Sequence, residues 1–574
     1  MSNFYTDNQD LMFTLEHIKL DDILNLMEDG FSKCEQYDTA PESFDDAMDN
    51  FKKIMEIVGE VAGERIAPRA SQIDREGPKF ENGNVSYHPL TELNLQDLKK
   101  TGLFGVILPR EYGGLHFPLT VYTMMTEMVS RADASLQNLF GLQDIAATIC
   151  EFGSEEQKQR YLPRFVSGEV DGSMDLTEPD SGSDLQSVRL KATQDENGQW
   201  YLDGVKRFIT NGCSKVHLVL ARSEKNTTDG RGLSMFICEK TPDLVVRNIE
   251  DKMGIHGVPT CELQFNHVPA ELCGMRKRGL IKYVMSLMNG ARISISAQAV
   301  GIAEAAYQEA RKYASERQQF KQTIDKFPPV YDMLAKMRAA LSASRAVLYE
   351  TTRNVDLRTA YTEKNDNMNP PSLELRNKVK YYTALTDTLT PISKALSTET
   401  ANMVAYYGIQ IHGGSGYMRD FNAERYYRDA RITNIYEGTT QLQIVAAIGG
   451  VMSQNIAPLL DELMEKIPEQ PTFSTYKTII RNLREKQKIA VEFVLGISEK
   501  TPDYRNLYAK NLVENETYIL ASLLLLRDSV MDEKRLPIAE YYIQNAEQDF
   551  NRNHQIVMNG NCFLLNNHES IISY

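Results

Sequence analysis

The strongest constraint on the fold is a change of pattern about 170 residues into the chain. Residues 1–170 carry apolar positions at helical spacing, and the same spacing returns from Lys282 to about Met452. The stretch between them contains short runs of β-prone residues instead. These expected strands are one or two within Trp200–Gly212, then His217–Arg222, Leu233–Cys238, Leu244–Ile249 and Cys261–Val268. The order of helices, sheet and helices predicts an α+β fold.

Two local signals refine this plan. A helix is expected from Phe44 to about Ile66, where Pro68 should stop it. The dipeptides Asp203-Gly204 and Asn211-Gly212 are typical of turns and should flank short β runs. The first ~35 residues also carry a helical apolar pattern, which suggests an extra docking segment.

Composition narrows the class of protein. The 574 residues are 42% hydrophobic and 25% charged, as in ordinary globular proteins. A formal charge of −15 argues against nucleic acid or an anionic membrane as the main partner. No secretory signal is visible at the start, and the apolar runs are too short for an integral membrane segment. The seven scattered cysteines include no C-x-x-C pair, which indicates reduced thiols in a cytoplasmic protein without a metal site.

The chain continues beyond Ser453 with further helical patterns. The expected segments are a helix and linker over Ile456–Pro471, then helices over Thr475–Ile497, Leu512–Val530 and Pro537–Asn553. Basic residues in the second segment, Lys477, Arg481, Arg484, Lys486 and Lys488, leave a membrane-docking helix open as an alternative. Glu485, Glu492 and the overall acidity favour helices packed on the body of the protein.

The stretch Asn434–Gln443 carries the clearest chemical signal. Glu437 lies on a glycine turn directly before an apolar helical pattern, and Gly438 allows tight bending and close approach of a ligand. Thr440 and Gln443 have the spacing of a capping box. The exposed N–H groups of such a helix start could bind an anion. A solvated acid capping a helix would be the default interpretation if this stretch stood alone.

Two further loops are suggestive only in combination. Leu176–Asp184 is rich in small hydroxylated residues beside the β segment, and Gln410–Tyr417 contains closely spaced glycines. His412 in the second loop could be a general base, but a packing role in a tight turn is the favoured interpretation.

Together these stretches resemble the acyl-CoA dehydrogenase family from about Ser43 to Val451, with every motif in family order. The motifs are Leu176-Thr-Glu-Pro-x-x-Gly-Ser-Asp184, Lys206–Gly212, Glu316-Arg-Gln-Gln-Phe320, Gln410-x-x-Gly-Gly414 and Glu437-Gly-Thr-x-Gln441. The extra length is similar to the longer bacterial branch of that family.

This resemblance implies a fold with an N-terminal helical domain, a middle β domain and a C-terminal four-helix bundle, followed by an appended helical domain. The expected boundaries are 1–42 for an N-terminal extension and 43–170 for the N-terminal helical domain. The middle β domain should span 171–280, the C-terminal bundle 281–455 and the appended helical domain 456–574. It also implies an FAD enzyme of acyl-CoA metabolism, such as fatty acid β-oxidation. Glu437 would take the α proton and a hydride would pass to flavin N5, giving a trans-2-enoyl-CoA. A raised pKa in a dry site would suit Glu437 to this task. Its backbone N–H would help hold the thioester carbonyl.

The resemblance also implies roles for individual residues. The expected FAD-binding residues are Met174, Leu176, Thr177, Ser183, Phe208, Thr210, Arg317, Gln319, Phe320, Gln410, Gly414, Thr439 and Gln441. The expected substrate-binding residues are Ser183, Asn289, Arg292, Tyr436 and Gly438. A buried helix arginine paired with an acid is a nearly equal interpretation of Arg292. Expected partners are acyl-CoA, electron-transferring flavoprotein and, because Arg317 should reach a neighbouring FAD, a second copy of the chain.

The sequence departs from the family pattern at Phe208, where tryptophan is common, at Lys321, where glycine is common, and over Gly274–Gly279. Some relatives carry the base on the helix containing Ala291, which cannot accept a proton, so Glu437 is favoured. Three alternatives remain: an acyl-CoA oxidase passing electrons to O2, a monooxygenase of the same fold, and a DNA-binding relative. Glu437 argues against the monooxygenase, and the acidic charge argues against DNA binding.

Overall fold

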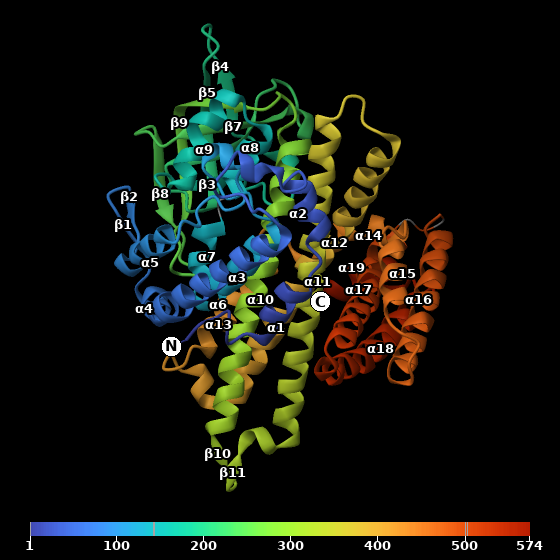
Figure 1. Ribbon diagram of the computed structural model, residues 1–574. Helices are drawn as coiled ribbons and strands as arrows, with labels where there is room; N and C mark the ends of the chain where they lie inside the picture. Colours follow the sequence, from blue (N-terminus) through green and yellow to red (C-terminus); the bar gives the residue numbers. More distant parts are fainter. Residues whose placement is uncertain (1, 142–143, 500, 502, 574) are drawn as a thin grey trace. The chain divides into compact units, whose positions relative to one another are not determined.

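The computed structural model describes residues 2–141, 144–499, 501 and 503–573, and its elements are labelled in Figure 1. The chain divides into two compact units. Unit 1 comprises residues 1–12, 20–305 and 425–433, and unit 2 comprises residues 13–19, 306–424 and 434–574. Three helices contribute residues to both units, namely α1 (Gln9–His17), α10 (Met285–Glu316) and α13 (Ala423–Thr433).

Unit 1 begins with helices that precede its sheet. They are α2 (Asp21–Met27), α3 (Phe44–Glu60), α4 (Ala67–Glu76), α5 (Pro89–Lys100), α6 (Leu119–Ala132), α7 (Ala134–Phe140), α8 (Asp144–Phe152) and α9 (Glu155–Val166). A small hairpin of β1 (Lys79–Glu81) and β2 (Asn84–Ser86) lies between α4 and α5. Most of α13 (Ala423–Thr433) also belongs to this unit.

The prediction that Pro68 ends the first long helix is wrong. A π-helical turn over Val61–Ile66 follows α3, and α4 then starts at Ala67 with Pro68 in its first turn. Proline is tolerated there because the N–H groups of a first helical turn have no intrahelical partner. The proline therefore marks the start of a helix.

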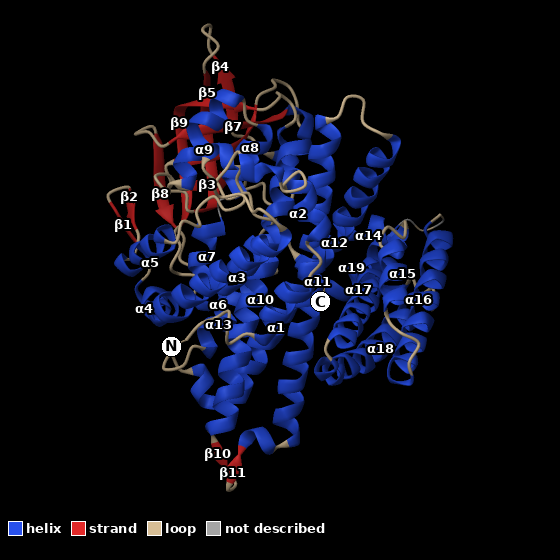
Figure 2. Cartoon of the chain, viewed as in Figure 1, coloured by secondary structure: helices blue, strands red, loops and turns tan. Residues whose placement is uncertain are grey.

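The middle sheet has seven strands, drawn in red in the upper part of Figure 2. They are β3 (Gly172–Asp175), β4 (Lys191–Gln194), β5 (Trp200–Thr210), β6 (Val216–Arg222), β7 (Leu233–Glu239), β8 (Leu244–Ile249) and β9 (Thr260–Cys273). The pairings run β4–β5–β9–β7–β6 and return to β4 at Lys191↔Arg222, so the sheet closes on itself. Apolar side chains from both faces form two buried cores, one containing Leu202, Phe236 and Phe265.

The sequence-predicted strands are present, with one correction. No turn forms at Asp203-Gly204, because β5 runs on through both residues with an irregularity in its pairing to β9. A second irregularity lies between Lys206 and Ile209, and there Phe208 adopts a positive φ of 59°. Such bulges bend a strand and redirect a side chain. They make β5 one long strand rather than two short ones.

Apart from a two-stranded hairpin, β10 (Gln318–Gln319) and β11 (Gln322–Thr323), the regular elements in the described residues of unit 2 are helices. Its helices are α11 (Pro328–Asn367), α12 (Leu373–His412), α14 (Thr440–Met452), α15 (Ala457–Lys466), α16 (Pro471–Ser498), α17 (Asp503–Met531), α18 (Leu536–Met558) and α19 (Phe563–Ile572). One continuous apolar core joins α11, α12 and α14 to α15–α18, through residues such as Leu389, Leu460 and Leu523. The helices after Ser453 therefore pack on the body of this unit.

The basic residues of α16 support the same conclusion. Lys477 is buried and donates to the carbonyl of Ile467 at 2.6 Å. Arg484 pairs with Asp461 at 2.6 Å, and Lys486 donates to Asn551 at 2.7 Å. These cations are thus engaged within unit 2. Among the described residues, no single helix is long and apolar enough to cross a membrane, and only the bent pair α14 and α15 meets that test by length and composition.

Candidate active site

The loop between α13 and α14 displays Glu437 in an uncommon backbone conformation. Glu437 has φ 53° and Gly438 has φ 90°, so two successive residues lie at positive φ. The following helix is capped by Thr439, whose Oγ1 accepts from the N–H of Leu442 at 3.3 Å. The predicted capping box at Thr440 and Gln443 is therefore wrong: the cap is Thr439, and Leu442 three residues later has no polar side chain to complete a box.

Several side chains of α12 and α14 hold this segment, Asn434–Thr440, which we call the base loop. Lys394 Nζ donates to the Gly438 carbonyl at 2.7 Å, and Gln443 Nε2 donates to the same oxygen at 2.9 Å. Gln443 Nε2 also lies 3.2 Å from the Glu437 carbonyl. The Thr440 N–H closes the loop on the Asn434 carbonyl at 3.1 Å. Glu437 itself is partly buried, as are Tyr436 and Gly438.

Sequence reasoning missed Lys394 as part of this site and gave Gln443 only a capping role. Lys394 lies on the buried face of α12 with Ile392, and Gln443 lies on the buried face of α14 with Ile444. A lysine within an apolar helical face is itself a signal, because buried lysines need a polar partner. The partner, however, is a backbone carbonyl 44 residues further along the chain.

In unit 1, the residues expected at the flavin lie on two adjoining segments. Met174 lies in β3, Leu176 and Thr177 follow that strand, and Phe208 and Thr210 lie at the end of β5. The Arg207 N–H donates to the Thr177 carbonyl at 2.9 Å, which brings the two segments together. Ser183 is exposed further along the same loop.

A buried ion pair fixes the loop that carries Thr177. Lys206 Nζ donates to the Leu176 carbonyl at 2.8 Å and pairs with Glu178 at 3.0 Å. The Glu178 carboxylate also accepts from the N–H groups of Arg189 and Leu190, at 2.7 and 2.9 Å. Burial lowers the pKa of the Lys206 ammonium, and the Glu178 carboxylate opposes that shift. The loop is therefore tied to the sheet by the protein's own side chains.

These segments fit a flat, partly polar ring system. The Phe208 side chain is 54% exposed at the second irregularity of β5, with the Arg207 guanidinium 4.7 Å from its ring centroid. The hydroxyls of Thr177 and Thr210 have no hydrogen-bond partner within the described part of the chain. An exposed aromatic ring beside unsatisfied hydroxyls is suited to stacking on a flavin and donating to its polar edge.

In unit 2, the expected adenine-binding residues lie on the β10–β11 hairpin and at the end of α12. Arg317, Gln319 and Phe320 are all exposed, and Phe320 is 89% exposed. Lys321 has φ 68°, a left-handed conformation that glycine adopts with less strain. This explains in physical terms why glycine suits this position. The hairpin keeps its turn with lysine there.

The glycine turn after α12 is open. A Cβ added to Gly413 or Gly414 would meet no atom within 4 Å, so a ligand could approach this backbone closely. Gln410 is exposed nearby on the last turn of α12, and Thr439 and Gln441 lie at the start of α14. His412 is buried, stacks on Tyr313 at 4.3 Å between ring centroids and makes a hydrogen bond through Nδ1 to the Gly408 carbonyl. A packing role for His412 is the better interpretation.

The two substrate-binding candidates on α10 contact one another. Arg292 is buried and its guanidinium donates to Asn289 Oδ1 at 2.9 Å. Ala291 between them is also buried. The residues expected at FAD and substrate are thus divided between the units: Met174, Leu176, Thr177, Ser183, Phe208, Thr210, Asn289 and Arg292 lie in unit 1, and the rest lie in unit 2.

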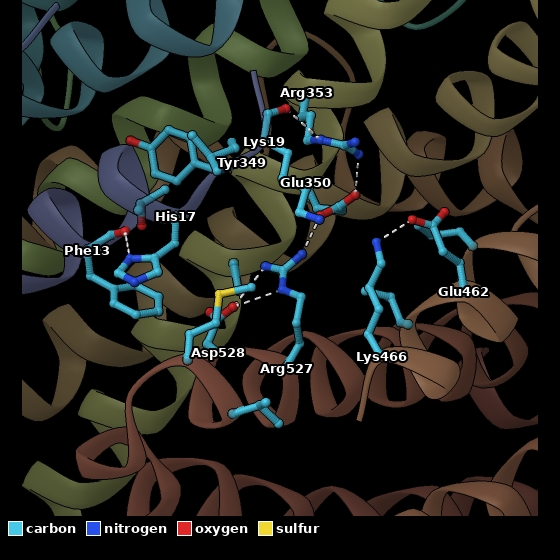
Figure 3. A pocket seen from close by; sticks show the side chains of 17 residues that line it. Phe13, His17, Lys19, Tyr349, Glu350, Arg353, Glu462, Lys466, Arg527 and Asp528 are labelled. Atoms are coloured by element: carbon cyan, nitrogen blue, oxygen red, sulfur yellow. Dashed lines mark hydrogen bonds and ion pairs between the residues drawn. The ribbon is translucent and has the colours of Figure 1, made fainter. Parts of the chain in front are cut away.

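A separate cavity of about 190 Å³ lies within unit 2 (Figure 3). The N-terminal segment Phe13–Lys19 forms one wall, and α11, α15 and α17 form the others. Its charged side chains pair with one another. Arg527 contacts Glu350 at 2.6 Å and Asp528 at 2.9 Å, while Arg353 donates to the Lys19 carbonyl at 3.0 Å. The ion pairs join α11 to α17, and the bond from Arg353 ties the N-terminal segment to α11.

The fold and these motifs define a class of protein. Models of the acyl-CoA dehydrogenase N-terminal, middle and C-terminal domains match residues 49–169, 173–268 and 278–448. The chain belongs to the acyl-CoA dehydrogenase family and is an oxidoreductase acting on acyl-CoA. FAD is the cofactor that accompanies this family membership, and the residues described above fit it. Among the described residues, no group of three or more His, Cys, Asp or Glu side chains could hold a metal ion.

Individual relatives place the chain within the family. It is 32% identical over 479 residues to 3-methylmercaptopropionyl-CoA dehydrogenase of Ruegeria pomeroyi, covering 77% of this chain and 75% of that one. It is 35% identical to an acyl-CoA dehydrogenase of Bacillus subtilis, covering 61% and 86%.

Solved structures show the same architecture. Butyryl-CoA dehydrogenase of Megasphaera elsdenii superposes with a TM-score of 0.60 at 28% identity, covering 70% of this chain and 98% of that one. An acyl-CoA dehydrogenase of Bacillus anthracis complexed with FAD gives 0.75 at 24% identity, covering 89% and 88%. The second likeness, which shows the fold alone, covers a larger share of this chain than the family models, which end at residue 448.

Proposed function

We propose that this protein is an FAD-dependent acyl-CoA dehydrogenase that converts a saturated acyl-CoA to its trans-2-enoyl-CoA, with Glu437 as the base. The observation that carries the proposal is the base loop. It presents one carboxylate in a strained, well-anchored conformation at the head of α14. Strain that the surroundings sustain is characteristic of functional sites.

The reaction requires removal of a very weakly acidic proton from the carbon next to the thioester carbonyl. A carboxylate is an adequate base only if it is held at the α carbon and the carbonyl is polarised at the same time. Glu437 supplies the carboxylate. Its backbone N–H is the proposed donor to the thioester oxygen, where negative charge develops as the proton leaves.

FAD bound by the chain supplies the acceptor, at flavin N5, for the hydride that leaves the β carbon. On the protein side, Phe208, Thr177 and Thr210 are the proposed contacts to the ring, with Met174, Leu176 and Ser183 beside them. Arg317, Gln319, Phe320, Gln410 and Gly414 are the proposed contacts to the adenine half of a cofactor in a second copy of the chain. Thr439 and Gln441 are proposed at its phosphates, and Asn289, Arg292, Tyr436 and Gly438 at the substrate.

The proposed acceptor of the electrons is electron-transferring flavoprotein. A structure solved in work on the electron-transferring flavoprotein of Acidaminococcus fermentans resembles this chain, with 31% identity and a TM-score of 0.59. The relatives named above include enzymes for butyryl and 3-methylmercaptopropionyl thioesters, so both kinds of acyl group are candidates for the substrate.

The test is anaerobic titration of the purified holoenzyme with a panel of acyl-CoAs, followed by the absorbance of the oxidised flavin. The panel should contain straight-chain, branched and 3-methylmercaptopropionyl thioesters. At least one should bleach the flavin. A yellow protein that no thioester bleaches would refute the proposal. Formation of peroxide in air at the rate of turnover would show that the protein is an acyl-CoA oxidase instead.

Glu437→Gln is the matched variant. It keeps the shape of the side chain but cannot accept the proton, so flavin reduction should slow by about 10²- to 10⁴-fold. FAD content and binding of the enoyl-CoA product should be retained. Normal reduction by this variant would place the base elsewhere.

A further inference from the structure

We propose that Lys394 and Gln443 are positioning residues for the base loop, which they hold by its carbonyls so that Glu437 keeps its left-handed conformation. This inference rests on the proposed function, since it assigns these residues to the presentation of the base. Neither residue belongs to the motifs by which the sequence resembles its family.

The first step of the argument is the convergence of donors on one oxygen. The Gly438 carbonyl accepts from Lys394 Nζ at 2.7 Å and from Gln443 Nε2 at 2.9 Å. A carbonyl oxygen has two lone pairs, so these two donors can occupy both. One of the donors is an ammonium, and hydrogen bonds from charged donors are the stronger kind.

Burying the polar side chains of Lys394 and Gln443 costs free energy unless their donors find hydrogen-bond partners. Lys394 and Gln443 are both 0% exposed. An ammonium in a helical interface is destabilising unless polar groups surround it, and a hydrophobic residue would serve packing better. The Gly438 carbonyl of the base loop is one such polar group. Lys394 therefore connects the core of unit 2 to the residue that follows Glu437.

The backbone that they hold is strained. Glu437 has φ 53°, and left-handed backbone is unfavourable for an L-residue with a side chain. Gly438 carries φ 90°, and a Cβ there would lie 2.7 Å from Gln443 Nε2. Glycine is thus needed both for the conformation and for the approach of the amide. Without the two donors, the Glu437–Gly438 peptides would be free to relax to a less strained geometry.

The other side of the loop is tied down separately. Glu399 Oε1 on α12 accepts from Asn434 Nδ2 at 3.1 Å and from Thr440 Oγ1 at 2.5 Å. These bonds hold the two ends of the loop, whereas Lys394 and Gln443 hold its centre. Because Glu399 is exposed, its contribution is the weaker one.

The experiment compares Lys394→Met with the wild-type holoenzyme. Methionine keeps most of the length of the side chain but donates no hydrogen bond. The rate constant for flavin reduction at saturating acyl-CoA should fall about ten- to a hundredfold, the scale expected for a misplaced catalytic group. The dissociation constant of the enoyl-CoA product and the FAD content should stay close to wild type. Lys378→Met, on the same helix but paired with Tyr361 and Glu374 at the surface, is the matched control and should reduce normally.

Hydrogen exchange of the peptide containing Gly438, measured without substrate, is the second readout. It should increase in Lys394→Met and not in Lys378→Met. Gln443→Met should also slow flavin reduction and increase exchange of this peptide. If Lys394→Met does not fold, Gln443→Met is the variant that tests the positioning role. Wild-type reduction rates and unchanged exchange in both variants would overturn the inference.

The two proposals can fail separately. If no acyl-CoA reduces the wild-type flavin, the proposed function fails, and the exchange data alone decide whether the two residues order the loop. If wild type is reduced and Lys394→Met is reduced equally fast, the proposed function stands and the positioning role is wrong.

Discussion

At the scale of single residues, Glu516 shows how burial sets a titration. This carboxyl group lies on α17 at a cavity beside α16, and it is only 7% exposed. Burial raises its pKa from 4.5 to about 7, although a hydrogen bond with the Gln487 side chain and the charge of Arg484 pull in the opposite direction. Glu516 is therefore largely protonated in the folded protein under mildly acidic conditions.

This shift predicts a pH-dependent stability. The pKa of Glu516 is higher in the folded than in the unfolded protein. The protonated carboxyl group therefore contributes its full share to the free energy of unfolding below about pH 4.5, and this contribution is lost as pH rises through about 7. Its size is about 3 kcal/mol at most. Glu516→Gln should remove this dependence and raise the melting temperature relative to wild type at pH 8. Glu485 is an exposed acid on α16, so Glu485→Gln is the control and should leave the pH dependence of the melting temperature as in wild type. Parallel melting curves for Glu516→Gln and wild type across pH 5–8 would contradict the prediction.

At the scale of elements, an ion network joins α11 to α17. Glu350 on α11 accepts from Arg527 on α17 at 2.6 Å, and Arg353 lies 3.3 Å from the same carboxylate. Burial by itself would raise the pKa of the Glu350 carboxyl, but Arg527 and Arg353 outweigh it and hold that pKa below its usual value. The network therefore stabilises the packing of these helices above the unfolded pKa of Glu350 and weakens as pH falls toward the folded value.

Arg527→Met should consequently destabilise unit 2. Removing one partner leaves Glu350 buried with less compensation, at a cost on the order of 3 kcal/mol. The loss, measured as a lowered melting temperature, should be larger at pH 8 than at pH 5, where Glu350 can take up a proton. The double variant Glu350→Gln/Arg527→Met should recover part of the stability. A double variant less stable than Arg527→Met would show that the pairing is not the cause.

At the scale of the whole molecule, unit 2 exposes two aromatic side chains and an arginine on the β10–β11 hairpin and after α12. Phe320 is 89% exposed and Tyr417 is 77% exposed. The Arg317 guanidinium has no hydrogen bond or ion pair within the described part of the chain. Exposed aromatic residues and arginine are enriched in interfaces. They support the proposed homo-oligomer, in which Arg317 and Phe320 reach the FAD of another copy.

Arg317→Ala tests that assembly. If the guanidinium holds a neighbouring cofactor, the purified variant should lose FAD more readily on dilution, with a dissociation constant raised about tenfold or more. Lys312→Ala, an exposed cation on the last turns of α10, is the control and should retain FAD. Occupancy should be measured by flavin absorbance, together with mass by light scattering. Equal FAD retention in both variants would contradict the cross-subunit role.

Much of the fold could be predicted from the sequence because it depends on local patterns. The β-prone runs predicted most of the ends of β6–β9 to within a few residues. The helical periodicities after Ser453 predicted α15–α18. The errors arose where a residue's effect depends on its position within an element. Pro68 starts α4 instead of ending α3, and Asp203-Gly204 is absorbed into a long strand by a bulge.

By itself, the sequence determined the order of elements, the family motifs and Glu437 as the candidate base, because these depend on neighbours along the chain. Only the tertiary structure decided which groups hold that base. Lys394 lies 44 residues before Gly438, and its ammonium meets the carbonyl only after α12 and α14 have packed together. A hydrogen bond to a backbone carbonyl cannot be predicted from the type of the accepting residue, because every residue carries the same acceptor. The chemistry could therefore be predicted from residue types, whereas its positioning required the fold.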